Sequence, residues 1–152
     1  MTYYGNQEIL KHYKTAFFCS QKCPATVILK SYDWAIEQRT QGNCIITAAH
    51  SPIEKDVFLF LLKGTQPLIL VTGKIAYLRI DSPIKKAVED KRLLIITMGN
   101  TKRQFSKNSV FKRNLYIARL ADEILVSYAL PEGSITRLID KISSAKTITF
   151  LQ

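Results

Sequence analysis

Six short apolar segments alternate with longer amphipathic segments, and this alternation restricts the fold of the chain more than any other feature. Nearly all of the short segments are apolar at consecutive positions, as strands of a parallel sheet covered on both faces must be. The predicted strands are Ala16–Cys19, Cys44–Thr47, Leu68–Val71, Leu93–Thr97, Glu123–Tyr128 and Thr147–Leu151. This order predicts an α/β protein with a doubly wound, mostly parallel six-stranded sheet, helices on both faces and right-handed crossovers.

The amphipathic segments predict five helices, two of which carry clear start or stop signals. Ser51, Pro52 and Glu54 form a capping-box pattern with proline in the first turn, and Gly42 is placed to end the first helix. The predicted helices are Pro24–Gln41, Ser51–Gly64, Ser82–Lys91, about Asn108–Ala121, and Ser134–Ala145. Residues 1–14 fall outside the alternation, and we expect a small helical appendage there, with residues 15–152 forming one domain.

Charge is the first property that bears on function. The 152 residues contain 22 Lys and Arg against 12 Asp and Glu, a net charge of +10 that indicates a polyanionic partner. The stretch from Thr101 to Ala121 has no acidic residue and contains Lys102, Arg103, Lys107, Lys112, Arg113 and Arg119. Phe105, Phe111 and Tyr116 are interleaved with these cations, a combination that can neutralise phosphates and stack on unpaired bases. The alternative interpretation is a solvated basic helix face with the aromatic rings in the core.

The chain lacks the motifs of several common site types. Its longest aliphatic and aromatic run, Val57–Leu62, is far shorter than the roughly 18 residues of a membrane-spanning helix, and the N-terminus lacks a secretory signal pattern. We therefore expect a cytoplasmic protein with no membrane contact. Cys19, Cys23 and Cys44 favour neither a disulfide scaffold nor a zinc site, and GxGxxG, GxxxxGK[ST], GxSxG and HExxH are absent. We predict no cofactor, no metal and no catalytic residue, and favour a binding protein over an enzyme.

Residues that follow the predicted strands are the second pointer to function, because doubly wound sheets bind ligands at the carboxyl ends of their strands. Ser20 and Lys22 follow the first strand, His50 the second and Lys74 the third. His50 either belongs to a site or anchors the next helix. After the fifth strand, a turn with glycine and hydroxyl residues opens the last helix, whose free N–H groups can receive a phosphate; its residues are Gly133, Ser134 and Thr136. By itself this turn is also an ordinary, well-capped helix start.

Two stretches of the chain resemble the DNA-processing protein A family. Residues 111–122, FKRNLYIARLAD, and residues 133–136, GSIT, are similar to its F-x-x-R-N-x-x-I-A-x-L-(S/A) and G-S-x-x-T stretches. Residues 45–50 and the segment through the third strand look like its S-G-x-A-x-G-I-D…G-x-T-I-x-V region. The resemblance covers about residues 15–152. The resemblance implies a Rossmann-like fold and binding of single-stranded DNA. Members of that family also load a recombinase during transformation.

Some turns depart from the family pattern. Ser20-Gln21-Lys22 stands where the family has Gly-Ser-Arg, and Ala48-Ala49-His50 replaces a glycine-rich turn. The family's flanking domains have no counterpart, which implies a shortened, stand-alone relative. The wider superfamily contains lysine-decarboxylase-like phosphoribohydrolases with a P-G-G-x-G-T-x-x-E motif. Residues 131–136 are similar to it, but residues 137–139 bring no catalytic glutamate.

Our leading hypothesis is a non-enzymatic domain that binds single-stranded DNA or another nucleic acid at the carboxyl edge of the sheet. We expect Lys22, Arg103 and Arg113 to contact phosphates, Asn114 to position Arg113, and Phe105 to stack on a base. The predicted nucleic-acid-binding residues are Ser20, Lys22, His50, Lys74, Arg103, Phe105, Arg113, Asn114, Gly133, Ser134 and Thr136. Two alternatives stay open: a sensor or hydrolase for a nucleotide or nucleotide-derived ligand, and a subunit that binds an acidic protein. Homodimer formation also stays open.

Overall fold

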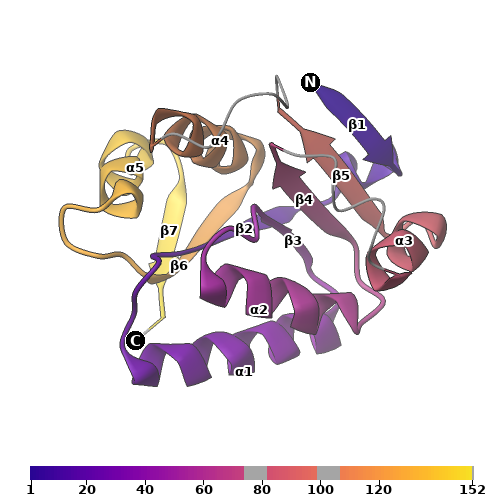
Figure 1. Cartoon of the computed structure of the whole chain (residues 1–152), viewed down its shortest axis with the longest axis horizontal. Helices are drawn as coiled ribbons and strands as arrows, with labels where there is room; N and C mark the ends of the chain where they lie inside the picture. The colour runs from indigo at the N-terminus through magenta and orange to yellow at the C-terminus, as the bar shows by residue number, and fades with distance from the viewer. Residues whose placement is uncertain (74–81, 99–106, 152) are drawn as a thin grey trace.

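The computed structural model describes residues 1–73, 82–98 and 107–151, which form an α/β structure with one central sheet (Figure 1). All six predicted strands and all five predicted helices are present, with ends within three residues of the expected ones. The strands are β1 (Thr2–Gly5), β2 (Lys14–Cys19), β3 (Cys44–Thr47), β4 (Leu68–Thr72), β5 (Leu93–Thr97), β6 (Glu123–Tyr128) and β7 (Thr147–Phe150). The helices are η1 (Gln7–Lys11, a 3-10 helix), α1 (Ala25–Gln41), α2 (Pro52–Leu62), α3 (Ser82–Glu89), α4 (Lys107–Leu120) and α5 (Ser134–Ile142).

The sheet has seven strands in the order β1-β5-β4-β3-β2-β6-β7, and every pair is parallel except β1 with β5. The prediction of a mostly parallel, doubly wound sheet is confirmed, but the predicted number of six strands is wrong. The additional strand is β1, so residues 1–14 contain a strand besides the small helical part that we expected. Thr, Tyr and Tyr favour extended backbone, and residues 2–5 pair with the free edge of β5. Only the short η1 is helical in this part of the chain.

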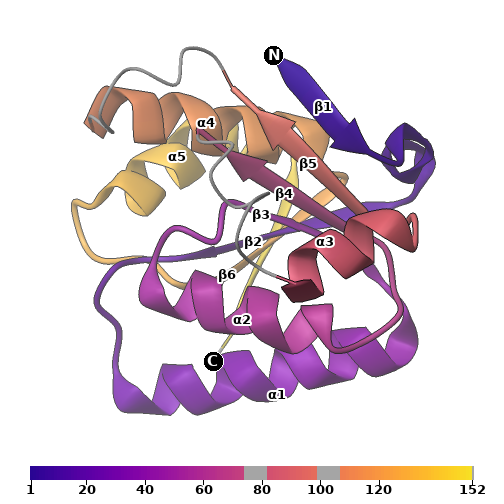
Figure 2. The ribbon, with the colours of Figure 1, turned by 45° about the vertical axis from the view of Figure 1, so that its right-hand side comes forward.

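Helices cover both faces of the sheet (Figure 2). One apolar cluster joins the sheet to α1, α2 and α3, and a second joins its other face to α4 and α5. The residues of β2, β3, β4 and β5 are buried throughout, because each of these strands is covered from both sides. This explains why the sequence is apolar at consecutive positions and not at alternate ones.

The predicted helix signals are present in the structure. Ser51 and Glu54 form the capping box at the start of α2, where the Glu54 N–H donates to Ser51 Oγ and Glu54 Oε1 accepts from the Ser51 N–H. Gly42 ends α1 in the left-handed conformation, with φ of 78°, which glycine adopts without strain. Local sequence signals therefore set the end of α1 and the start of α2 on one face of the sheet.

Candidate functional site

A cavity of about 640 Å³ opens at the carboxyl ends of β2 and β6. The two strands are neighbours, but the chain leaves β2 toward α1 on one face and leaves β6 toward α5 on the other. Diverging connections of this kind form the crevice where doubly wound sheets bind ligands. The cavity lies between the β2–α1 turn, the β3–α2 turn, α4 and the start of α5.

The predicted site residues fall into three groups. Those that line the cavity are Ser20, His50, Arg113, Asn114, Gly133 and Ser134. Lys22 is exposed beside the cavity and is not part of its wall, and the Thr136 hydroxyl donates to the Leu130 carbonyl at 2.8 Å. Lys74, Arg103 and Phe105 lie outside the described residues. The structure therefore brings together side chains from both ends of the sequence at one edge of the sheet.

Glu54 is the buried centre of this cavity wall. Its Oε2 accepts the Cys19 N–H at 3.0 Å, and its Oε1 accepts the His50 N–H at 3.0 Å and the Ser51 N–H at 3.3 Å. The side chain is 3% exposed, and burial raises its pKa, whereas these N–H donors and the Arg113 charge act in the opposite direction. One carboxylate thus ties the end of β2 to the end of β3. The sequence indicated Glu54 only as a capping residue.

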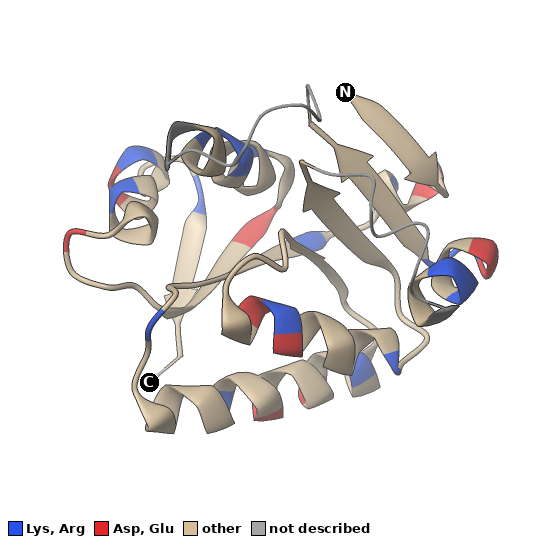
Figure 3. Ribbon diagram, in the orientation of Figure 1, with Lys and Arg blue, Asp and Glu red and all other residues tan. Residues whose placement is uncertain are grey.

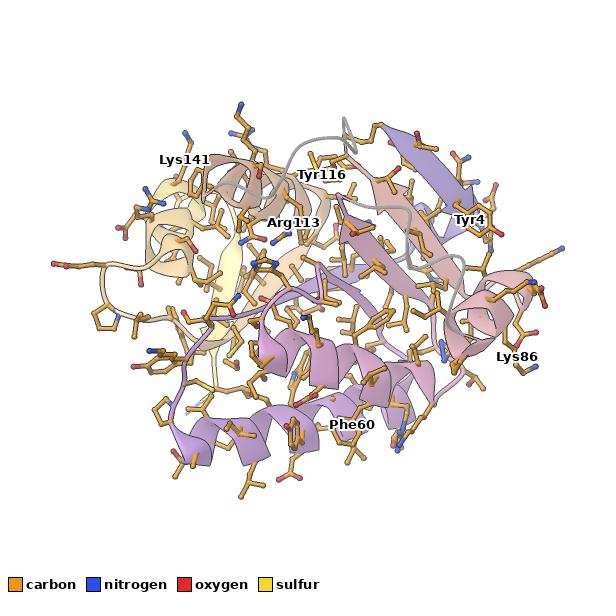
Figure 4. All side chains as sticks on the ribbon, viewed as in Figure 1. Tyr4, Phe60, Lys86, Arg113, Tyr116 and Lys141 are labelled. Carbon is orange, nitrogen blue, oxygen red and sulfur yellow. The ribbon has the colours of Figure 1, made fainter. Side chains whose placement is uncertain are left out.

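Arg113 and Asn114 project from α4 into the cavity wall, and both are buried. Arg113 Nη2 donates to Asn114 Oδ1 at 3.3 Å, so the two neighbours are in contact, and the positioning role of Asn114 stays a prediction. Figure 4 shows Arg113 on the inner side of α4. Burial lowers the pKa of His50, and the positive charges of Arg113 and Lys55 lower it further. The wall therefore holds the positive charge of Arg113 close to the buried carboxylate of Glu54.

The loop between β6 and α5 forms the opposite wall. Ser20 Oγ accepts the Leu130 N–H at 2.8 Å, and the Leu130 carbonyl accepts the Gly133 N–H at 2.9 Å. A side chain at Gly133 would meet that carbonyl at 3.0 Å, so glycine permits the close approach. Gly133 is the N-cap of α5 and offers no side-chain cap, which leaves first-turn N–H groups at the cavity. Backbone donors at a helix start favour an anion.

Besides Glu54, the sequence hypothesis missed two charged residues of this wall. Arg137 lines the cavity from the first turn of α5, and its guanidinium lies over the Phe111 ring at 5.5 Å from the centroid. Helical spacing from Ser134, three residues earlier, could have indicated Arg137. Glu132 also lines the cavity and has a left-handed φ of 62°, which a sequence pattern does not reveal. The described residues contain no group of His, Cys, Asp and Glu that could hold a metal ion.

Sequence comparison gives no relative: no protein-family model matches the chain, and no curated protein matches it significantly. No helix formed by the described residues is long and apolar enough to cross a membrane.

Solved structures do match the fold. One describes the single-stranded DNA binding mode of DNA processing protein A from Helicobacter pylori; it has a TM-score of 0.75 and 17% identity, over 99% of this chain and 70% of that one. DNA processing protein A from Streptococcus pneumoniae matches with a TM-score of 0.78 and 18% identity, over 99% of this chain and 54% of that one. This chain therefore spans about half the length of the second protein. The molybdenum cofactor carrier protein from Chlamydomonas matches less well, with a TM-score of 0.59 and 11% identity over 93% of this chain. The Rossmann-like fold implied by the family resemblance is thus confirmed, and the chain has the fold found in DNA processing protein A.

Proposed function

We propose that this chain binds single-stranded DNA and holds part of its phosphate backbone in the cavity at the carboxyl ends of β2 and β6. The observation that carries the proposal is the convergence, in one cavity, of buried Arg113, the exposed Arg137 and the uncapped start of α5. A guanidinium and backbone N–H groups are the donors that proteins use for phosphate. The net charge of +10 adds a long-range attraction for a polyanion.

The fold comparison supports DNA as the ligand. A protein with the same fold, from Helicobacter pylori, has been described for its mode of binding single-stranded DNA. Extended single-stranded DNA fits better at the open edge of a sheet than in a closed pocket. Its unpaired nucleotides expose the phosphates and bases that such an edge can contact.

A nucleotide or nucleotide-derived ligand is the second candidate, and the cavity volume favours it. A volume of about 640 Å³ is within the roughly 300–1,000 Å³ of small-molecule sites. The two candidates differ in one measurable way: affinity for single-stranded DNA rises with oligonucleotide length, whereas a nucleotide site is saturated by the mononucleotide.

Fluorescence anisotropy with labelled oligothymidylates, a duplex and mononucleotides, each at two salt concentrations, tests the proposal. We expect single strands to bind most tightly, with a log–log salt slope of about −0.7 for each phosphate contact. Affinity that does not change with salt, or preference for the mononucleotide, would refute it.

Two variants locate the site. Ser134→Asp places a carboxylate at the start of α5, where it suits the helix dipole but repels phosphate, so we expect a folded protein with about tenfold weaker DNA binding. Thr26→Asp adds the same charge to the first turn of α1 outside the cavity, and it should bind like the wild type. Arg113→Ala should also lose affinity, although it removes a charge that faces buried Glu54 and needs a parallel stability measurement. Equal binding by Ser134→Asp and Thr26→Asp would place the DNA elsewhere.

A further inference from the structure

Exposed cations lie on α4 and α5, from the rim of the cavity outward. Lys112 and Arg119 are exposed on α4, seven residues apart and therefore about 10 Å apart along the helix axis. Arg137 and Lys141 are exposed on α5, one turn apart. We call these four residues the α4–α5 basic face. In Figure 4, Lys141 extends away from the body of the protein, in contrast to Arg113.

No carboxylate that the structure describes forms an ion pair with this face. Among the described residues, the ion pairs join Lys11 to Glu8, Lys14 to Asp122 and Lys86 to Asp90, all outside α4 and α5. Lys146 differs, because its ammonium donates to the Arg119 and Ala121 carbonyls at the end of α4. In the part of the chain that the structure describes, none of the four cations of the α4–α5 basic face forms an ion pair, and Arg137 lies over the Phe111 ring.

The other helical layer shows no comparable excess of charge. Helices α4 and α5 together contain six Lys and Arg and one acidic residue, whereas α1, α2 and α3 contain five Lys and Arg and five acidic residues. Figure 3 shows the difference as blue on α4 and α5 and mixed colours on α1 and α2. Positive charge is thus concentrated on the α4 and α5 side of the sheet. Solubility does not require such a concentration, whereas a surface that binds a polyanion does.

Arg137 connects this face to the cavity. It is exposed, yet it also lines the cavity, and its guanidinium lies over the Phe111 ring. A guanidinium held over an aromatic ring keeps N–H groups available to a phosphate oxygen, and the contact limits the conformations that binding must restrict.

We propose that the DNA strand held in the cavity passes Arg137 and continues over the α4–α5 basic face, where Lys112 and Lys141 contact its phosphates. This inference rests on the proposed function and specifies the path and length of the bound strand. It predicts that a dinucleotide uses the cavity alone, whereas an oligonucleotide of about 20 nucleotides uses both surfaces.

The test compares two double variants with equal changes of net charge. Lys112→Glu/Lys141→Glu alters the α4–α5 basic face, and Lys30→Glu/Lys63→Glu alters exposed lysines at α1 and the end of α2. We expect the first to bind the long oligothymidylate about tenfold more weakly, with a salt slope shallower by about 1.4, and to bind the dinucleotide nearly as the wild type does. The second should bind both ligands nearly as the wild type does. Thermal unfolding of each variant checks that the fold is intact.

The possible outcomes separate this inference from the proposed function. Equal losses in the two double variants would show a general charge effect and overturn the proposed path. The path is also overturned if Lys112→Glu/Lys141→Glu binds the long oligothymidylate as tightly as the wild type does. If that variant at the same time loses a co-purifying acidic protein, the α4–α5 basic face is assigned to protein contacts. If the wild type binds neither ligand, the proposed function itself fails.

Discussion

The substitution Glu54→Gln tests whether one buried carboxylate holds the cavity together. Glutamine keeps one carbonyl oxygen, which can still accept the His50 and Ser51 N–H groups, but it places an NH₂ group where Oε2 accepts the Cys19 N–H. One hydrogen bond to a charged acceptor is then lost, and a buried N–H faces another donor. The variant also removes the negative charge that faces Arg113.

The structure allows an estimate of the effect. Leaving one buried backbone donor unsatisfied costs about 1–3 kcal/mol, and removal of the unfavourable burial of the Glu54 charge offsets part of this. We expect the free energy of unfolding in urea to fall by about 2 kcal/mol. Glu89→Gln, an exposed position on α3, is the matched control and should change it by less than about 0.5 kcal/mol.

A second measurement follows the predicted location of the defect. Hydrogen exchange of the Cys19 amide should accelerate in Glu54→Gln more than exchange of amides in the middle of β4. If Glu54→Gln unfolds at the same urea concentration as the wild type and the Cys19 amide stays protected, Glu54 does not tie β2 to β3.

Three further predictions concern pH and the cavity rim. Burial and nearby positive charge lower the pKa of His50, and a bound phosphate should favour proton uptake by its imidazole. DNA affinity should therefore rise as the pH falls from about 8 to 6. His50→Gln should flatten this pH dependence in anisotropy titrations. The Lys14 N–H, followed by the Lys14 ammonium, lowers the pKa of Asp122; its stabilising contribution is therefore present above the carboxyl's ordinary pKa and lost as the pH falls through the lowered value. Asp122→Asn should reduce the acid sensitivity of thermal unfolding, and a wild-type acid profile in the variant would contradict the assignment. Glu132→Gly relieves a left-handed residue and should raise the unfolding free energy by about 0.5–1 kcal/mol, whereas Glu132→Gln should leave stability unchanged. Both Glu132 variants should bind DNA more tightly because a carboxylate leaves the cavity rim, and unchanged affinity in both would remove that residue from the site.

The sequence predicted the sheet and its covering helices because buried parallel strands and helix caps have local signatures. It did not predict β1, since residues 2–5 have no apolar alternation and become a strand only by pairing with β5. Pairing partners far apart in the sequence are set by the tertiary fold, which no local window contains.

The site was predictable to the extent that it depends on strand ends. Ser20, His50 and Gly133 follow three different strands and therefore meet at one edge. Glu54 and Arg137 were missed as wall residues because their position depends on which side of a helix turns toward the crevice. Lys22 follows the expected strand but does not line the cavity, and its contact with phosphate stays a prediction.

The antiparallel edge strand has a consequence for the behaviour of the protein at high concentration. The apolar strand β5, Leu93–Thr97, has no charged residue, and without β1 it would present unpaired N–H and C=O groups along its length. An exposed, uncharged, β-prone edge of this kind pairs with strands of other molecules and promotes aggregation. Residues 2–5 therefore cover that edge, and their removal should increase self-association, which light scattering at rising protein concentration would detect.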